Sequence, residues 1–262
     1  MSVSKGKMLW ALYKKDLKGS KFEMFFMLGM FLVGNIYLYY KTRTDWPVPA
    51  GFVANFMGAG VIFLFIFFKA FQVIRSEWKD NTVYLMMSLP VSGKIIFLSK
   101  LLSLLTQWLV LEVLVGLGAW FFLKEFITMN ELREIQNQIF PWIKEITKLA
   151  LLIFLGMNQG LLIAFFSSVV GKLVKKFSGL VTFGTFIAAT MLISNISSGI
   201  LDIIFRKEVN ELTSKEIVFT NGRFVFDVFP NDFYWVVIAL LVVTSIGIFF
   251  STAAIYDRRV EL

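Results

Sequence analysis

The sequence predicts an all-α membrane protein with six transmembrane helices, and three observations lead to this fold class. Hydrophobic residues make up 57% of the 262 residues and charged residues only 17%, whereas soluble domains carry about 25% charged residues. The mean hydropathy is +0.73. The apolar residues are concentrated in runs of about 20, which is the length that a helix needs to cross the roughly 30 Å hydrocarbon core of a bilayer.

Six apolar runs meet this length requirement, and we interpret the whole chain, 1–262, as one transmembrane domain. Only the residues KLVKK at 172–176 separate the fourth run from the fifth, so we predict a tight turn between two antiparallel helices there. The predicted transmembrane helices are 22–40, 52–74, 102–123, 149–171, 177–200 and 233–255.

The distribution of lysine and arginine predicts that both chain ends are cytoplasmic. Basic residues gather in the N-terminal tail, in the connection 75–101, in the turn after the fourth span and in the tail after the sixth. In the other three connections, basic residues are roughly balanced or outnumbered by Glu and Asp. Short loops rich in Lys and Arg stay on the cytoplasmic side of a membrane.

Several classes of chemistry are excluded because the chain contains neither cysteine nor histidine. Cysteine nucleophiles, Ser–His–Asp triads and His-based metal sites are therefore absent, and we expect no catalytic residue and no metal ligand. The formal charge of +8 comes from basic residues beside the spans, so we expect contacts with membrane lipid and none with nucleic acid.

The N-terminal residues 1–21 predict an interfacial amphipathic helix on the cytoplasmic side. Apolar side chains recur at helical spacing on one face, and lysines spread over the other face. Such a helix lies along the surface of a leaflet with its apolar face buried. The apolar face consists of Leu9, Leu12, Tyr13 and Leu17, and the basic face of Lys7, Lys14, Lys15 and Lys18.

Two longer segments, 124–148 and 201–232, predict a small extracellular cap. The first has an amphipathic helical pattern on Leu132, Ile135 and Ile139 that breaks near Pro141. The second contains Asn221-Gly222 between two β-prone runs, and Asn-Gly is a strong signal for a two-residue β-hairpin turn.

Few charged or amide side chains lie inside the predicted spans. Glu112 is the acidic residue nearest to a span centre, and Gln107 lies on a neighbouring turn. Since an exposed charge costs at least ~2.5 kcal/mol there, Glu112 should face the helix bundle or be protonated. It contacts either the substrate or a partner subunit, or it forms a hydrogen bond within the bundle. Lys69 is expected to extend toward the lipid headgroups.

The fourth span carries small residues on one face. Gly156, Gly160 and Ala164 follow one another at intervals of four, a spacing that lets helix backbones approach closely. The close partner is either another helix of this chain or a second subunit. We expect Asn158 and Gln159 between them to form hydrogen bonds between helices.

The connection 75–101, RSEWKDNTVYLMMSLPVSGKIIFLSK over its first 26 residues, contains a short predicted helix. Asp80 or Asn81 can cap its N-terminus, and Pro90 ends it, because the residue before a proline avoids the helical conformation. Its apolar side chains suit a docking surface, since methionines adapt to a partner; the alternative is a loop that rests on the membrane. These side chains are Tyr84, Met86, Met87 and Leu89.

This connection resembles the cytoplasmic signature of type-2 ABC transporter permeases (the ABC-2 family). The matching residues are Glu77, Asn81-Thr82, Ser88-Leu89-Pro90-Val91-Ser92 and Lys100, and the plan of six spans with an N-terminal amphipathic helix is similar too. The chain departs from the family in having Asn81 where a glycine is usual, and in its long segment 124–148. The resemblance implies a coupling helix that docks on an ATPase subunit through Glu77, Asp80, Thr82, Tyr84, Met86, Met87, Leu89 and Pro90.

The resemblance also implies the partners. Because the chain contains no G-x-x-x-x-G-K-[ST] loop, we expect it not to be an enzyme, with ATP and Mg held by a separate ABC ATPase subunit. A second permease copy, identical or related, would complete the pathway in a bacterial cytoplasmic membrane. The aromatic-rich spans favour a hydrophobic or amphipathic cargo, and the resemblance favours antimicrobial peptides or peptide toxins. The alternative function is a membrane-embedded immunity or sensor protein that binds peptide without pumping it.

Overall fold

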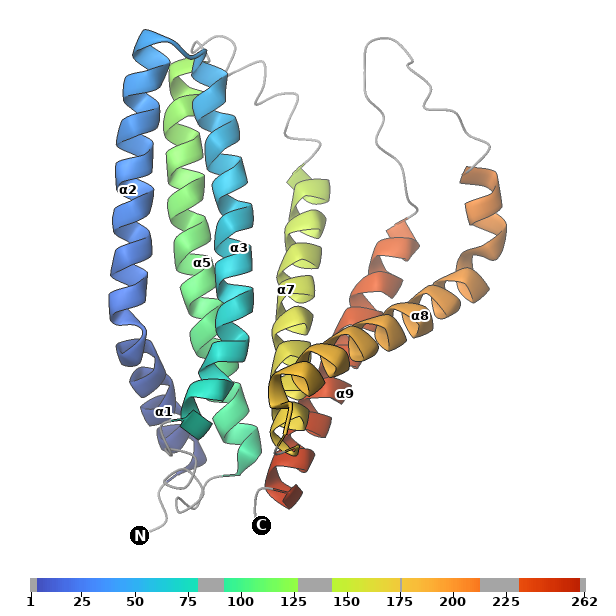
Figure 1. Cartoon of the computed structure of the whole chain (residues 1–262). Coiled ribbons are helices and arrows are strands. Elements are labelled where there is room, and N and C mark those ends of the chain that lie inside the picture. The colour runs from blue at the N-terminus through green and yellow to red at the C-terminus, as the bar shows by residue number, and fades with distance from the viewer. Residues whose placement is uncertain (1–3, 80–91, 127–142, 175, 213–230, 260–262) are drawn as a thin grey trace. The chain divides into compact units, whose positions relative to one another are not determined.

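Helices account for all the regular structure in the part of the chain that the structure describes. The structure is a computed structural model that describes residues 4–79, 92–126, 143–174, 176–212 and 231–259. Six of its helices are long and apolar enough to cross a membrane (Figure 1), which confirms the all-α class and the number of spans for these residues. The helices are α1 (Lys5–Gly19), α2 (Lys21–Thr44), α3 (Val48–Lys79), α5 (Gly93–Phe126), α7 (Ile143–Lys172), α8 (Ser178–Leu212) and α9 (Asn231–Arg259).

The helices extend beyond the predicted spans because hydropathy marks the membrane core and not the end of a helix. α3 continues past residue 74 to Lys79, and α5 begins at Gly93, well before residue 102. Both ends of the connection 75–101 are therefore helical. The predicted coupling helix, the amphipathic helix around Leu132 and the hairpin at Asn221-Gly222 lie outside the described residues.

The chain forms two compact units. Unit 1 comprises Met1–Thr147 and Ala253–Leu262, and thus contains α1, α2, α3, α5 and the last turns of α9. Unit 2 comprises Lys148–Thr252, which holds α8 and most of α7 and α9. In both units, helices are the structure expected in lipid, because an apolar solvent offers no partner to the backbone N–H and C=O groups.

Unit 1 is built around the packing of α3 against α5. Buried side chains of α3 recur every four residues, which gives one ridge along the helix for packing into a groove of its neighbour. This ridge consists of Ile62, Ile66, Ala70 and Ile74. On α5 the buried residues include Phe97, Leu104, Leu111 and Val115.

The amphipathic N-terminal segment is a helix, as predicted, and α1 packs mainly on α5. The four residues of its apolar face are half-buried, whereas the four lysines of the opposite face are exposed. The hydroxyl groups of Tyr13 and Thr106 lie 3.1 Å apart and share a hydrogen bond. Part of the face expected to contact lipid therefore covers another helix of the chain.

Unit 2 contains two predicted features. Gln159 of α7 donates a hydrogen bond from Nε2 to the Thr244 hydroxyl of α9 at 2.6 Å, which confirms Gln159 as a link between helices. α7 ends at Lys172 and α8 begins at Ser178, so a short connection separates the two helices at the place where a tight turn was predicted. At this turn a Cβ on Gly171 would collide with the Thr182 side chain, so glycine is needed for the close approach.

Candidate functional site

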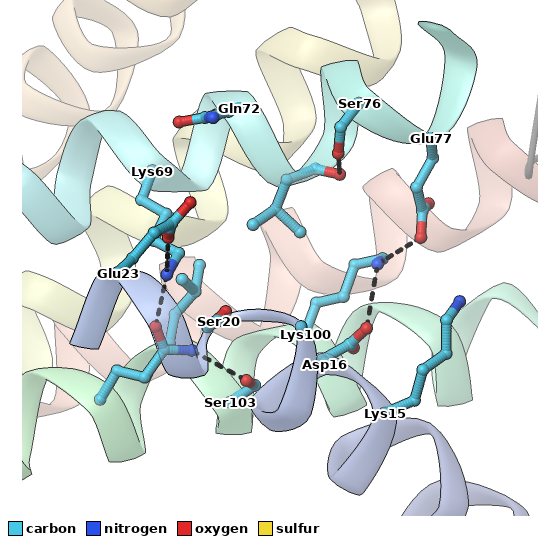
Figure 2. A pocket seen from close by; sticks show the side chains of 14 residues that line it. Lys15, Asp16, Ser20, Glu23, Lys69, Gln72, Ser76, Glu77, Lys100 and Ser103 are labelled. Carbon is cyan, nitrogen blue, oxygen red and sulfur yellow. Dashed lines mark hydrogen bonds and ion pairs between the residues drawn. The ribbon is translucent and has the colours of Figure 1, made fainter. Parts of the chain in front are cut away.

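A polar cavity of about 410 Å³ lies between α1, α2, α3 and α5 of unit 1 (Figure 2). It forms where α1 passes into α2 at Gly19 and Ser20, beside the end of α3 and the beginning of α5. Charged and hydroxyl side chains dominate its wall. The lining residues are Lys15, Asp16, Gly19, Ser20, Glu23, Lys69, Gln72, Val73, Ser76, Glu77, Lys100, Ser103, Leu104 and Gln107.

The first group of contacts in this cavity centres on Lys100. Figure 2 shows its side chain extending from α5 between Glu77 of α3 and Asp16 of α1. Lys100 forms an ion pair with Glu77, and its Nζ lies 3.8 Å from Oδ1 of Asp16. The side chains of Lys100 and Glu77 are only 2% and 9% exposed. One buried cation thus holds three helices together.

The second group centres on Lys69 of α3. This lysine forms an ion pair with Glu23 of α2 and donates a hydrogen bond to Oε1 of Gln107 at 2.7 Å. Gln107 in turn donates to the hydroxyl of Ser103 at 3.0 Å. The expectation that Lys69 reaches the lipid headgroups is wrong: it is 5% exposed, because neighbouring helices supply both a carboxylate and an amide oxygen.

The charges that line the cavity cancel. Three lysines face three carboxylates, namely Lys15, Lys69, Lys100, Asp16, Glu23 and Glu77. Such a balanced wall does not create the single-sign field that attracts ions of one charge. Among the described residues, no group of three or more Asp, Glu, His or Cys is placed to hold a metal ion. The arrangement is suited to joining helices through ion pairs.

Among the residues singled out from the sequence, Lys69, Glu77, Lys100 and Gln107 line this cavity, whereas Glu112 does not. Glu112 is half-buried on α5 and accepts a hydrogen bond at 3.0 Å from Nε1 of Trp108, one turn earlier in the same helix. Gln107 and Glu112 therefore belong to separate sets of contacts, although they are close in sequence.

Replacing Glu112 by glutamine is expected to leave folding unchanged, because the amide oxygen can still accept the Trp108 hydrogen bond. Replacing it by leucine removes this acceptor, at a cost of about 1–3 kcal/mol. Thermal unfolding in detergent compares the two variants. An equal loss of stability in both would show that the Trp108 hydrogen bond is not what Glu112 contributes.

The small residues of α7 were predicted to allow a close helix approach, and they differ in how closely they are packed. Ala164 is fully buried and Gly160 half-buried. A Cβ on Gly156 would have no heavy atom of the described residues of unit 2 within 4 Å, so this glycine does not serve a close helix approach inside the unit. The predicted docking residues Asp80, Thr82, Tyr84, Met86, Met87, Leu89 and Pro90 lie outside the described residues.

Two carboxylates of the cavity, Asp16 and Glu23, were not predicted as site residues from the sequence. A usable signal was present for Glu23, because Glu23 in the first span and Lys69 in the second are opposite charges inside neighbouring apolar runs. An amide pair was not predicted either, in which Nδ2 of Asn55 donates to Oδ1 of Asn35 at 3.0 Å. Asn55 is 2% exposed, and this pair joins α2 to α3.

No protein-family model, no curated protein and no solved structure matches this chain. The features that bear on function are therefore the residues of the connection 75–101 and the contacts at its two helical ends.

Proposed function

We propose that the chain is the membrane-spanning permease subunit of an ATP-driven ABC exporter of type 2. It would couple ATP hydrolysis, carried out with Mg by a separate ATPase subunit, to the export of a hydrophobic or amphipathic substrate. Both units would act as one permease domain, with both chain ends in the cytoplasm of a bacterium. The six spanning helices are the minimum that this proposal requires.

The buried ion pair between Glu77 and Lys100 is the observation that carries the proposal. Glu77 lies in the last turn of α3 and Lys100 in the second turn of α5, so the pair joins the two helices that lead into and out of residues 80–91. In the resemblance, these two residues are the acidic residue and the lysine that flank the docking segment. A force applied to this segment would be passed to both spanning helices together, because their ends are tied to each other.

Transport would follow from a joint movement of the end of α3 and the beginning of α5. One six-span chain supplies half of a pathway, so we propose that two permease copies, identical or related, bind two ATPase subunits. Closure of the ATPase subunits on ATP would move the docking segments and rock the spans. Membrane lipid surrounds the assembly.

Peptides are the cargo that we propose, and this choice comes from the resemblance. The abundance of phenylalanine supports it less than the sequence suggested, because most aromatic side chains of α2 are exposed. Phe22, Phe25 and Phe26 are 81%, 70% and 58% exposed, as expected of side chains that contact lipid. Antimicrobial peptides and peptide toxins are the classes to test first.

Replacing Leu89 by aspartate is expected to abolish association with the ATPase, because a carboxylate cannot enter an apolar docking cleft without a large desolvation cost. The tagged chain is solubilised from its native membranes in mild detergent, purified, and analysed by mass spectrometry. The unaltered chain is expected to carry an ABC ATPase at near-equal stoichiometry, whereas Leu89→Asp should carry at least tenfold less.

The control variant is Pro47→Asp, which adds a carboxylate to the exposed turn between α2 and α3 and should retain the ATPase. Equal membrane levels of all three chains show that insertion is unaffected. If the unaltered chain purifies alone, the permease proposal is wrong, and a non-pumping immunity or sensor protein becomes the better explanation. If Leu89→Asp keeps the ATPase, the docking role of this segment is wrong.

A further inference from the structure

The last turns of α9 lie against both helical ends of the predicted docking segment. Ala253, Tyr256 and Asp257 belong to unit 1 together with α3 and α5. Ala253 is fully buried and Tyr256 is 5% exposed. The end of the sixth span therefore packs inside the unit that carries the connection 75–101, although its sequence position is far from that connection.

Asp257 caps the beginning of α5. Its Oδ1 accepts a hydrogen bond from the backbone N–H of Gly93, the first residue of α5, at 2.8 Å. The first four N–H groups of a helix have no partner inside the helix, and a carboxylate at this end also interacts favourably with the helix dipole. Residues close in sequence usually provide such a cap, but here the cap comes from a position 164 residues later.

Gly93 permits this close approach. A Cβ at this position would lie 2.6 Å from Oδ1 of Asp257 and 3.0 Å from Cδ1 of Tyr256. Both distances are shorter than van der Waals contact. A larger residue would therefore push the beginning of α5 away from α9.

Tyr256 contacts both the beginning of α5 and the end of α3. Its ring makes an edge contact with Trp78 of α3, with centroids 6.2 Å apart, and another with Phe97 of α5 at 5.2 Å. Phe97 is 1% exposed. Edge-to-face ring pairs at these distances are favourable beyond the area they bury. One aromatic side chain thus touches the helix that enters residues 80–91 and the helix that leaves them.

From these contacts we infer that Tyr256 and Asp257 are positioning residues for ATPase binding: they hold the end of α3 and the beginning of α5 at the separation that presents the docking segment. The inference rests on the proposed function. This role differs from that of Glu77 and Lys100. The ion pair joins α3 to α5 directly, whereas Tyr256 and Asp257 belong to a third helix, α9, and contact the last turn of α3 and the first turn of α5.

The chemistry of each side chain gives a conservative variant for comparison. Asp257→Asn keeps an oxygen that can accept from Gly93, whereas Asp257→Ala does not. Tyr256→Phe keeps the ring contacts and removes a hydroxyl that has no hydrogen-bond partner among the described residues, whereas Tyr256→Ala removes the ring. If only the charge or the hydroxyl mattered, Asp257→Asn would behave like Asp257→Ala, and Tyr256→Phe like Tyr256→Ala.

The first measurement uses the permease chain alone and does not depend on any partner. Amide hydrogen exchange at the beginning of α5, from Gly93 to Ile96, is followed in lipid nanodiscs. Loss of the hydrogen bond to Asp257 is expected to speed exchange of the Gly93 amide by about tenfold or more in Asp257→Ala, with Asp257→Asn, which keeps an acceptor oxygen but no charge, between Asp257→Ala and the unaltered chain. Unchanged exchange in Asp257→Ala would overturn the inference.

The second measurement is ATPase co-purification from native membranes. Asp257→Ala and Tyr256→Ala are expected to carry at least threefold less ATPase than the unaltered chain, while Asp257→Asn and Tyr256→Phe carry normal amounts. Normal co-purification by both alanine variants would overturn the inference and leave the proposed function intact. If even the unaltered chain carries no ATPase, the proposed function fails, and with it the positioning role, whatever the exchange rates show.

Discussion

Replacing Lys100 by methionine is expected to destabilise the chain by about 3–5 kcal/mol, because it removes the cation that forms an ion pair with the buried carboxyl group of Glu77. Lys100 is 2% exposed, and it also faces Asp16 on α1. Methionine has nearly the same length as the apolar part of lysine, so packing changes little and the loss reports on charge. Thermal or denaturant unfolding in detergent gives the free-energy difference.

Two further variants make this result specific. Lys100→Met combined with Glu77→Gln removes both charges and should recover most of the lost stability. Lys41→Met removes the cation of an exposed pair, in which Lys41 Nζ lies 2.8 Å from Oδ2 of Asp45 one turn away, and exposed pairs contribute about 0–1 kcal/mol. If Lys100→Met costs no more stability than Lys41→Met, the buried ion pair of Lys100 with Glu77 is not an important contributor to stability.

Replacing Gly51 by alanine is expected to cost about 1–3 kcal/mol, which is the usual penalty for overpacking a close contact. A Cβ on Gly51 of α3 would lie 2.6 and 2.7 Å from Cε1 and Cγ of the Phe122 ring on α5. Phe122 is 1% exposed, so the ring has little space into which to move. The variant should unfold at a lower temperature than the unaltered chain.

Gly58 on the same helix is the matched position. A Cβ there would meet no heavy atom of the described residues within 4 Å, so Gly58→Ala should be neutral or stabilising by up to ~1 kcal/mol through helix propensity. Adding Phe122→Leu to Gly51→Ala should restore part of the loss. Equal effects of the two alanine substitutions would show that the Phe122 contact does not limit packing.

Structural features that depend only on the nearby sequence were predictable. A run of about 20 apolar residues must be helical in lipid, so the positions of the spans followed from composition. The face of α1 followed from the spacing of Leu9, Leu12, Tyr13 and Leu17. Gln159 was also predictable as an interhelical link, since a polar amide inside a span must find a partner on a neighbouring helix.

Contacts that depend on which helices are neighbours were not predictable. Lys69 has two reasonable outcomes, extension to the headgroups or pairing with a carboxylate, and the choice depends on Glu23 of α2 lying beside it. Asp257 looks like an ordinary charged residue after a span. Its role as the cap of α5 is visible only once the fold brings it to Gly93.

The packing of α1 on α5 has a consequence for biosynthesis. Tyr13 and Thr106 are 93 residues apart in the chain, and a ribosome adds about 5–20 residues per second. Roughly 5 to 20 s therefore pass between synthesis of the first helix and synthesis of the helix it finally contacts. During this time something other than α5 must cover Leu9, Leu12 and Leu17, and the membrane surface is the nearest apolar phase. α1 would then reach its final place late, moving from lipid to protein only after α5 has been inserted.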